Sequence, residues 1–216
     1  MPHFRAVVFD QDGTLLDTFI PALHAYSVAV GREITMAELE PVAHLGAARN
    51  LVSALLGHEA SDADDDRFHA ALADALLGIE PYPGVVDTLE QLRARGLRTG
   101  VATNSDSRSA TIVLGAHGLA EHLDTVVTVD QVSGPKPNPE SILLAVERLG
   151  VRPDEVLFVG DAPADMVAAR AAGVLAAVAG WGHQAHGIVP GAADRWLDGP
   201  AEILDLIDGS GASERG

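Results

Sequence analysis

Cysteine is absent from the 216 residues of this chain. Disulfide bonds, thiolate metal ligands and a cysteine nucleophile are therefore excluded. Aromatic residues make up only 4% of the sequence and hydrophobic residues 47%, so the core must be built mainly from Ala, Val, Leu and Ile. The lack of disulfides agrees with a reducing compartment, and we expect a cytoplasmic protein.

Basic residues are also scarce. Lysine and arginine together number 14 against 31 acidic residues, which gives a formal net charge of -17. This balance argues against a nucleic acid or an anionic membrane as partner, because both require a field of basic side chains. An anionic small molecule would need a local positive site, for which a divalent metal and one lysine would suffice.

Long apolar runs are missing as well. The longest, Val174–Trp181, is too short to span a bilayer. The first ten residues do not read as a signal peptide, because their apolar run is short and an acid follows at once. We therefore expect a soluble, intracellular protein without a membrane partner.

The segment FDQDGTLLDT, residues 9–18, is the most informative one present. Asp10 and Asp12 follow a short apolar run, and Gly13 then predicts a turn. Strand geometry would point both carboxylates to one side at an exposed strand end. Two such acids repel each other unless a cation or a shared proton intervenes, so the pair indicates a metal site, a proton-transfer site, or both.

The apolar pattern predicts an α/β fold. After a first strand at Ala6–Phe9, residues from Leu15 to about Pro81 show helical periodicity. From Pro83 onwards helices and strands alternate, which is typical of a doubly wound parallel sheet, a Rossmann-like core. Strands are predicted at Leu97–Thr103, Thr125–Val129, Val156–Val159 and Val174–Val178, and helices at Val85–Gly96, Ser109–His117, Pro139–Leu149, Pro163–Ala172 and Glu202–Ile207.

The helical block reads as an insertion into this core. We predict a catalytic core domain of residues 1–15 and 83–216 and a helical cap domain of residues 16–82. The acidic run Asp62–Asp66 is interpreted as the start of a cap helix, where negative charge suits the helix dipole, rather than as a metal site. The tail Gly209–Gly216 is predicted to be disordered.

Chemically active side chains follow four of the predicted strands. These side chains belong to Asp10 and Asp12, to the segment Thr103-Asn104-Ser105, to Lys136 and to the segment Gly160–Asp165. Parallel sheets bind ligands at the carboxyl ends of their strands, so these segments are expected to meet at one edge.

These four segments, FDQDGTL, TNS, GPKPNPE and GDAPAD, resemble in order and spacing the signatures of the haloacid dehalogenase superfamily, specifically its phosphatase branch. The resemblance spans the whole chain. The stretches YPGVVDTLEQLRARG, GWGHQ and PAEILDLI are similar to phosphoglycolate phosphatases and their relatives. The implied activity is a Mg²⁺-dependent phosphatase acting on a small phosphorylated metabolite, with phosphoglycolate as the first candidate.

The resemblance also implies roles for individual residues. Asp10 would be the nucleophile that forms an aspartyl phosphate, and Asp12 the general acid and then the general base. Mg²⁺ would be held by Asp10, the backbone carbonyl of Asp12, Asp161 and Asp165, the last as a ligand or as an orienting residue. The phosphoryl group would be held by Gly13, Thr103, Asn104 and Lys136.

Two cap residues, His24 and Arg49, are candidates for selecting the substrate, although solvated helix positions fit them equally well. Asp17 is expected to cap the first cap helix. His183 and His186 suggest zinc but lack other nearby ligands, so a surface loop is the preferred interpretation.

Several alternatives stay open. A phosphosugar phosphatase or a sugar phosphate mutase would share every core residue, although Thr14 after Gly13 favours a phosphatase. A receiver domain gathers similar residues but needs no insertion of roughly 65 residues after the first strand. A phosphate-binding pseudoenzyme is disfavoured because no catalytic position is missing. The protein is expected to be a monomer or a homodimer.

Overall fold

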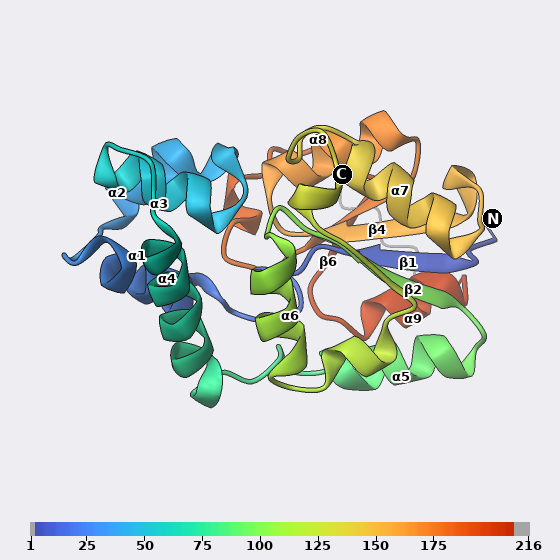
Figure 1. The fold of residues 1–216 in the computed structure, drawn as a ribbon. Helices are drawn as coiled ribbons and strands as arrows, with labels where there is room; N and C mark the ends of the chain where they lie inside the picture. Colours follow the sequence, from blue (N-terminus) through green and yellow to red (C-terminus); the bar gives the residue numbers. More distant parts are fainter. Residues whose placement is uncertain (1–2, 210–216) are drawn as a thin grey trace.

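The computed structural model describes residues 3–209. Of the tail Gly209–Gly216, for which disorder is predicted, all residues after Gly209 lie outside this range. Within it, six parallel strands form one sheet in the order β3-β2-β1-β4-β5-β6 (Figure 1). The strands are β1 (Ala6–Phe9), β2 (Arg98–Ala102), β3 (Thr125–Val127), β4 (Val156–Gly160), β5 (Leu175–Ala179) and β6 (Arg195–Leu197). The predicted α/β fold with a doubly wound parallel sheet is therefore confirmed.

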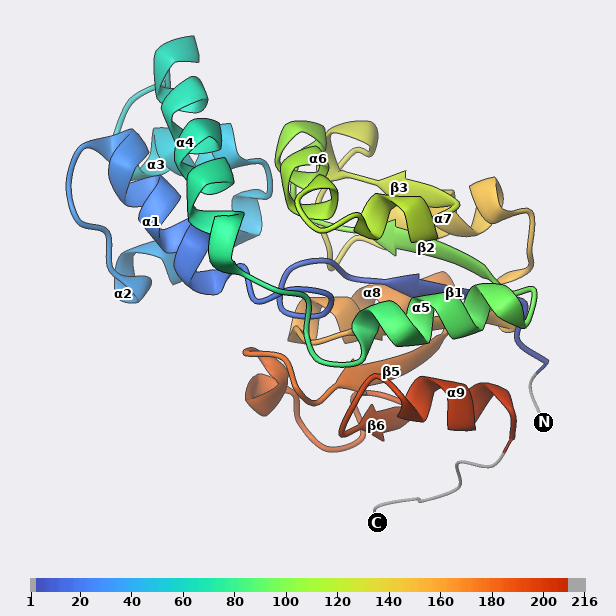
Figure 2. The same cartoon turned by 90° about the horizontal axis from the view of Figure 1, so that it is seen from below.

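Helices cover both faces of the sheet (Figure 2). The helices α5 (Val85–Ala94), α6 (Ser107–Gly115) and α9 (Glu202–Ile207) belong to one layer, and α7 (Glu140–Leu149) and α8 (Pro163–Ala172) to the other. The alternation of strand β1 divides its side chains between the layers: Val7 and Phe9 pack in one hydrophobic cluster, and Ala6 and Val8 in the other. A central strand buried on both faces explains why its sequence is continuously apolar.

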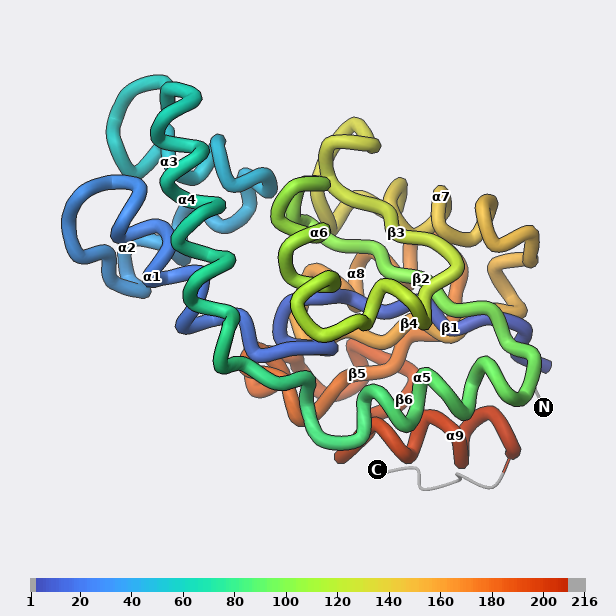
Figure 3. Tube along the Cα trace, turned by 60° about the horizontal axis from the view of Figure 1, so that its bottom comes forward, coloured from blue at the N-terminus to red at the C-terminus, as the bar shows by residue number. Residues whose placement is uncertain are grey.

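The remaining α-helices lie together beyond one end of the sheet, at the upper left of Figure 3. They are α1 (Phe19–Val30), α2 (Met36–Leu39), α3 (Ala48–Leu56) and α4 (Asp62–Ala75). Helix α4 begins as the sequence predicts, because Ser61 and Asp64 form a capping box at its first turn.

Two connecting segments, one on each side of the helical block, join it to the sheet, and they lie against each other. Leu16 forms an antiparallel bridge with Pro81, and the Tyr82 N–H donates to the Leu15 carbonyl at 3.0 Å. The helical block is therefore attached to the core by two paired segments next to the carboxyl end of β1.

Candidate active site

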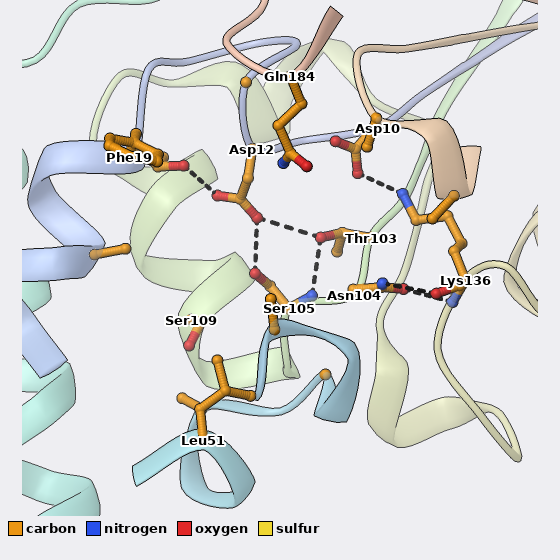
Figure 4. Close-up of a pocket in the computed structure, with 18 of the residues that line it drawn as sticks. Asp10, Asp12, Phe19, Leu51, Thr103, Asn104, Ser105, Ser109, Lys136 and Gln184 are labelled. Carbon is orange, nitrogen blue, oxygen red and sulfur yellow. Dashed lines mark hydrogen bonds and ion pairs between the residues drawn. The ribbon is translucent and has the colours of Figure 1, made fainter. Parts of the chain in front are cut away.

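The chemically active side chains gather at the carboxyl ends of the strands. Asp10 follows β1, Thr103 follows β2, Lys136 lies in the loop beyond β3, and Asp161 follows β4. Figure 4 shows Asp10, Asp12, Thr103 and Lys136 around one opening. All of them line a cavity of about 410 Å³ that extends under the helical block. The convergence expected from the strand pattern is what the structure shows.

Lys136 is a buried side chain of this cavity with three polar partners. Its Nζ lies 2.5 Å from Asp10 Oδ1 and 2.7 Å from Asp165 Oδ1, and it donates to the Ala102 carbonyl at 3.0 Å. Burial opposes its charge, but the two carboxylates outweigh burial and raise the pKa of Lys136 above its usual value. An ammonium group with three fixed partners is a permanent positive charge beside Asp10.

Three acids lie close enough together to share a cation. Ligand oxygens of Asp10, Asp161 and Asp165 are all within 4.8 Å of one another. Burial and the neighbouring acids raise the pKa of Asp161 to about 6, and burial raises the pKa of Asp10 in spite of Lys136. Asp161 Oδ1 is buried without a hydrogen-bond partner. A hard divalent cation would stabilise these ionised carboxylates and occupy the unused oxygen, so the residues fit Mg²⁺.

Two glycines leave the space that Asp161 occupies. A Cβ on Gly13 or on Gly182 would collide with the Asp161 side chain. Gly13 has in addition a φ of +82°, which suits glycine and allows the turn after Asp12. The Asp161 carboxylate also accepts a hydrogen bond from the Gln184 N–H at 3.0 Å. The orientation of Asp161 is thus set by the loops that follow β1 and β5.

Asp12 lies at the border between the sheet and the helical block. Its carboxylate accepts from the Thr18 hydroxyl at 2.7 Å and from the Ser105 hydroxyl at 2.8 Å. The amide of Gln11, a fully buried side chain, donates to both oxygens at 3.1 and 3.2 Å. None of these three contacts was predicted from the sequence. Only the motif around Thr103 contained a hint, since Ser105 is its third residue.

The side chain of Asn104 serves the loop of Lys136. Its oxygen accepts from the Lys136 N–H at 2.7 Å, and its amide donates to the Lys136 carbonyl at 3.2 Å. The amide group is thus occupied by the backbone of Lys136. Thr103 also lines the cavity, and its hydroxyl accepts from the Ser105 N–H at 3.0 Å.

The two candidate selecting residues do not lie among the residues that line the cavity. His24 is exposed on α1, and Arg49 on α3 pairs with Asp62 at 2.8 Å and donates to the Ala60 carbonyl at 2.9 Å. A role in selecting the substrate stays a prediction for both. The part of the cavity under the block is lined instead by apolar and aromatic side chains and by His44, the apolar ones being Phe19, Ala22, Tyr26, Leu39, Leu51, Phe68 and Leu72.

The loop after β5 that contains His183 and His186 also reaches the cavity. His183 lines it, and its Nε2 lies 2.7 Å from the Asp17 carboxylate. Thr18, not Asp17, is the N-cap residue of α1, although Asp17 accepts from the Phe19 N–H. The loop interpretation fits the exposed His183 and His186, but His183 has a partner that the sequence did not suggest.

This geometry can hold a phosphate group in front of an anionic nucleophile that has a fixed cation at its side. Asp10 offers a carboxylate at the floor of the cavity, Lys136 offers positive charge, and Asp12 offers an acid or base on the side of the opening. Together with the doubly wound sheet, this set defines a hydrolytic enzyme of the phosphoryl-transfer class.

The comparisons with known proteins agree with that class. A family profile described as haloacid dehalogenase-like hydrolase matches residues 4–173. An N-acetylmuramic acid 6-phosphate phosphatase from Pseudomonas aeruginosa is 34% identical over 95% of this chain and 96% of its own length. A phosphoglycolate phosphatase from Rhodospirillum rubrum is 36% identical over 83% of this chain and 80% of its own length.

A solved structure supports the fold over the same span. CbbY from Rhodobacter sphaeroides, crystallised with phosphate, aligns with a TM-score of 0.81 over 95% of this chain and 99% of its own, at 24% sequence identity. The chain belongs to the haloacid dehalogenase-like hydrolases. It is a phosphoric monoester hydrolase of that family. Among the described residues, every helix is too short or too polar to cross a membrane.

Proposed function

We propose that this protein is a Mg²⁺-dependent phosphatase that hydrolyses a small phosphorylated metabolite through an aspartyl phosphate on Asp10. The observation that carries the proposal is the buried contact of Asp10 with Lys136, 2.5 Å apart, beside two further acids. The cation lowers the pKa of Asp10 against the effect of burial and so favours its ionised, nucleophilic form, and it offsets the repulsion between this carboxylate and a phosphate dianion.

The carboxylates of Asp10 and Asp161 and the backbone carbonyl of Asp12 would hold the metal ion, with Asp165 as a further ligand or an orienting residue. The metal ion would neutralise charge on the phosphoryl oxygens. Asp165 already contacts Lys136 at 2.7 Å and accepts from the Ala162 N–H at 3.0 Å, which favours the orienting role.

In the first step Asp10 attacks phosphorus, and Asp12 gives its proton to the departing alkoxide. In the second step Asp12 takes a proton from water, which attacks the aspartyl phosphate and frees Asp10 and inorganic phosphate. Thr18 and Ser105 hold the Asp12 carboxylate at the side of the cavity that faces the helical block, the side where a leaving group would lie.

We also propose residues 16–82 as the cap that covers the leaving group, with the core formed by residues 1–15 and 83–216. The paired connection at Leu16 and Pro81 supports these limits. The names of the relatives make 2-phosphoglycolate and N-acetylmuramic acid 6-phosphate the first compounds to assay.

The test is a screen of phosphorylated metabolites with Mg²⁺ and with EDTA, on the wild type and on Asp10→Asn. We expect phosphate release that needs Mg²⁺ and is lost in Asp10→Asn, while circular dichroism shows an unchanged fold. Retention of more than about a tenth of the wild-type kcat/KM, a loss below about 1.4 kcal/mol, would point to another nucleophile. Transfer of phosphate between two positions of one sugar, without release, would identify a mutase instead.

A further inference from the structure

A second polar cluster, separate from the catalytic residues, joins the helical block to the core. Its centre is Asp106, the N-cap residue of α6, which follows directly after Ser105. One carboxylate oxygen accepts from the Ser109 N–H at 2.9 Å, within α6 itself. The other accepts from the Ala48 N–H at 3.0 Å, at the start of α3 in the block. One side chain therefore caps a core helix and holds a cap helix at the same time.

The second member of the cluster is His69, a buried residue of α4. Its Nδ1 lies 2.8 Å from the Asp65 carbonyl oxygen, and its Nε2 lies 3.3 Å from Asp106 Oδ1. A carbonyl and a carboxylate can only accept, so each ring nitrogen must carry a proton for both hydrogen bonds to form. The geometry is thus that of an imidazolium ion paired with a carboxylate. The Ser109 hydroxyl, 3.2 Å from Nε2, can also accept from it.

The electrostatics of the surrounding groups agree. Burial opposes the charge of His69, but Asp106 and the Asp65 carbonyl outweigh it and raise the pKa of His69. Burial is likewise outweighed at Asp106, whose pKa falls well below its usual range because His69 and two backbone N–H groups donate to it. Around the pair, Asp65 Oδ2 lies 3.3 Å from Nδ1 of His69, and Tyr26 of α1 stays neutral because burial and Asp106 raise its pKa.

Exposed ion pairs also join α4 to α6. Arg108 of α6 pairs with Asp65 at 3.1 Å and with Asp66 at 2.7 Å, both on α4. Figures 1 and 3 show α4 of the block next to α6 of the core. These exposed pairs contribute little individually, whereas the side chains of His69 and Asp106 are only 3% and 16% exposed, so salt screens their attraction less.

We propose that His69 and Asp106 are positioning residues that form a latch, closed when His69 is protonated, which docks the helical cap on α6 over the active-site cavity. The latch lies where cap position would matter for catalysis. Asp106 is adjacent in sequence to Ser105, which donates to Asp12, and Ser109 lines the cavity. Docking brings the apolar wall of the cap over the leaving group and excludes water.

The sign of the pH effect follows from the groups involved. The ion pair is complete while His69 is protonated and Asp106 ionised. As pH rises through the raised pKa of His69, the imidazolium loses one proton, so the ring can no longer donate from both nitrogens and the charge attraction to Asp106 disappears. The contacts of Arg108 and Ala48 and the packing of α4 on α6 remain, so the docking of the cap should loosen without being lost.

Distance measurements between two spin labels test the latch directly. The chain has no cysteine, so the exposed pair Ala63→Cys on α4 and Ala116→Cys at the end of α6 can be labelled selectively. We expect one narrow distance distribution at about pH 6 and a broader, longer one at about pH 9. His69→Gln, which keeps a neutral donor, should give the broader distribution at both values. The exposed His58→Gln serves as the matched control and should behave as the wild type.

Kinetics provide a second readout, which depends on the proposed function. In His69→Gln and Asp106→Asn the KM of the metabolite should rise about threefold to tenfold, while the inhibition constant of inorganic phosphate, which the core alone binds, stays unchanged. Asn is a good N-cap residue, so Asp106→Asn should retain α6. Identical narrow distributions at both pH values, also in His69→Gln, would overturn the latch. The phosphatase activity would then still stand, because its test is the Mg²⁺-dependent release of phosphate.

Discussion

Lys136 illustrates how much of the site depends on one side chain. It is the only lysine of the chain, and its ammonium group contacts Asp10, Asp165 and the Ala102 carbonyl. In a protein of net charge -17 this is the one cation at the floor of the cavity among the residues that line it. Its partners in turn are fixed by the strands that they follow.

Replacing this residue should therefore affect activity and stability together. For Lys136→Met we expect kcat/KM to fall by about a thousandfold or more, because the anionic floor then repels the substrate. The free energy of unfolding should fall by about 3–5 kcal/mol, since Asp10 and Asp165 lose their cation. Thermal unfolding should show a larger stabilisation by Mg²⁺ in the variant than in the wild type. A variant within tenfold of wild-type activity would contradict this role.

At the scale of residues, sequence reasoning identified the side chains that follow strands. The positions of Asp10, Thr103, Lys136 and Asp161 depend on strand ends, which the apolar pattern marks clearly. The contacts of Thr18 and Gln11 with Asp12 depend on the path of the turn after Gly13, which a sequence does not specify. The pairing of Arg49 with Asp62 was also beyond prediction, because it joins the starts of two different cap helices.

At the scale of elements, the glycine-containing loop after β5 contacts Asp161, a residue of the proposed metal site. A Cβ on Gly182 would meet the Asp161 side chain and the Gly13 backbone. Gly187 lies in the same loop, and its nearest contact would be Pro163 at 3.8 Å. Gly182 and Gly187 therefore serve as test and control positions, because only a Cβ on Gly182 would meet Asp161.

We expect Gly182→Ala to displace Asp161 and to raise the Mg²⁺ concentration needed for half-maximal activity about tenfold, a cost of about 1.4 kcal/mol. Gly187→Ala should leave the requirement unchanged. Metal titration of phosphate release, with calorimetry of Mg²⁺ binding as an activity-independent readout, measures both. Equal metal requirements in the two variants would show that the loop does not constrain Asp161.

The contact of α4 with α6 should also make stability depend on pH. The pKa of Asp106 is lowered on folding, so its contribution is present above the unfolded value near about pH 4 and lost as pH falls towards the folded value. The pKa of His69 is raised, so its contribution is present below about pH 6.5 and lost as pH rises through the folded value.

The difference in unfolding free energy between the wild type and Asp106→Asn should accordingly be largest between about pH 4 and pH 6.5 and shrink on both sides. Urea denaturation across this range measures the difference. A difference that is constant with pH would mean that Asp106 acts only as a helix cap.

Element prediction from sequence succeeded where periodicity was strong. The strand Ala6–Phe9 and the helices Pro163–Ala172 and Glu202–Ile207 have the predicted limits. The edge strand β6 was missed, because its three residues Arg195–Leu197 include two exposed side chains and show no buried run. Helix α6 starts at Ser107 rather than Ser109, since Asp106 supplies the cap.

At the scale of the whole molecule, chemistry is divided between two parts of the chain. The sheet edge holds the charged residues that we propose to bind the phosphoryl group, and the helical block supplies a mostly apolar wall. Alternation of strands and helices was sufficient to predict the first part. The second was predicted only as a helical insertion, because packing between α1, α3 and α4 determines which side chains face the cavity.

The oxygen ligands proposed for the metal ion predict a strict choice between Mg²⁺ and Ca²⁺. Mg²⁺ should support turnover and Ca²⁺ should support it poorly, because Ca²⁺ takes a larger, looser ligand shell and would misplace Asp10 against phosphorus. Steady-state assays with each metal after EDTA treatment measure this. Equal rates in EDTA and in Mg²⁺ would refute the metal requirement.

The central claim is that Asp10 becomes phosphorylated and that Asp12 then activates water. In Asp12→Asn the second step should become limiting for p-nitrophenyl phosphate, because nitrophenolate leaves without much acid help whereas water still needs a base. Quench-flow should show a burst of nitrophenolate close to one per active site. Denaturing mass spectrometry should then find the added phosphoryl mass on the peptide that contains Asp10. Slow turnover without a burst and without an adduct on Asp10 would contradict the mechanism.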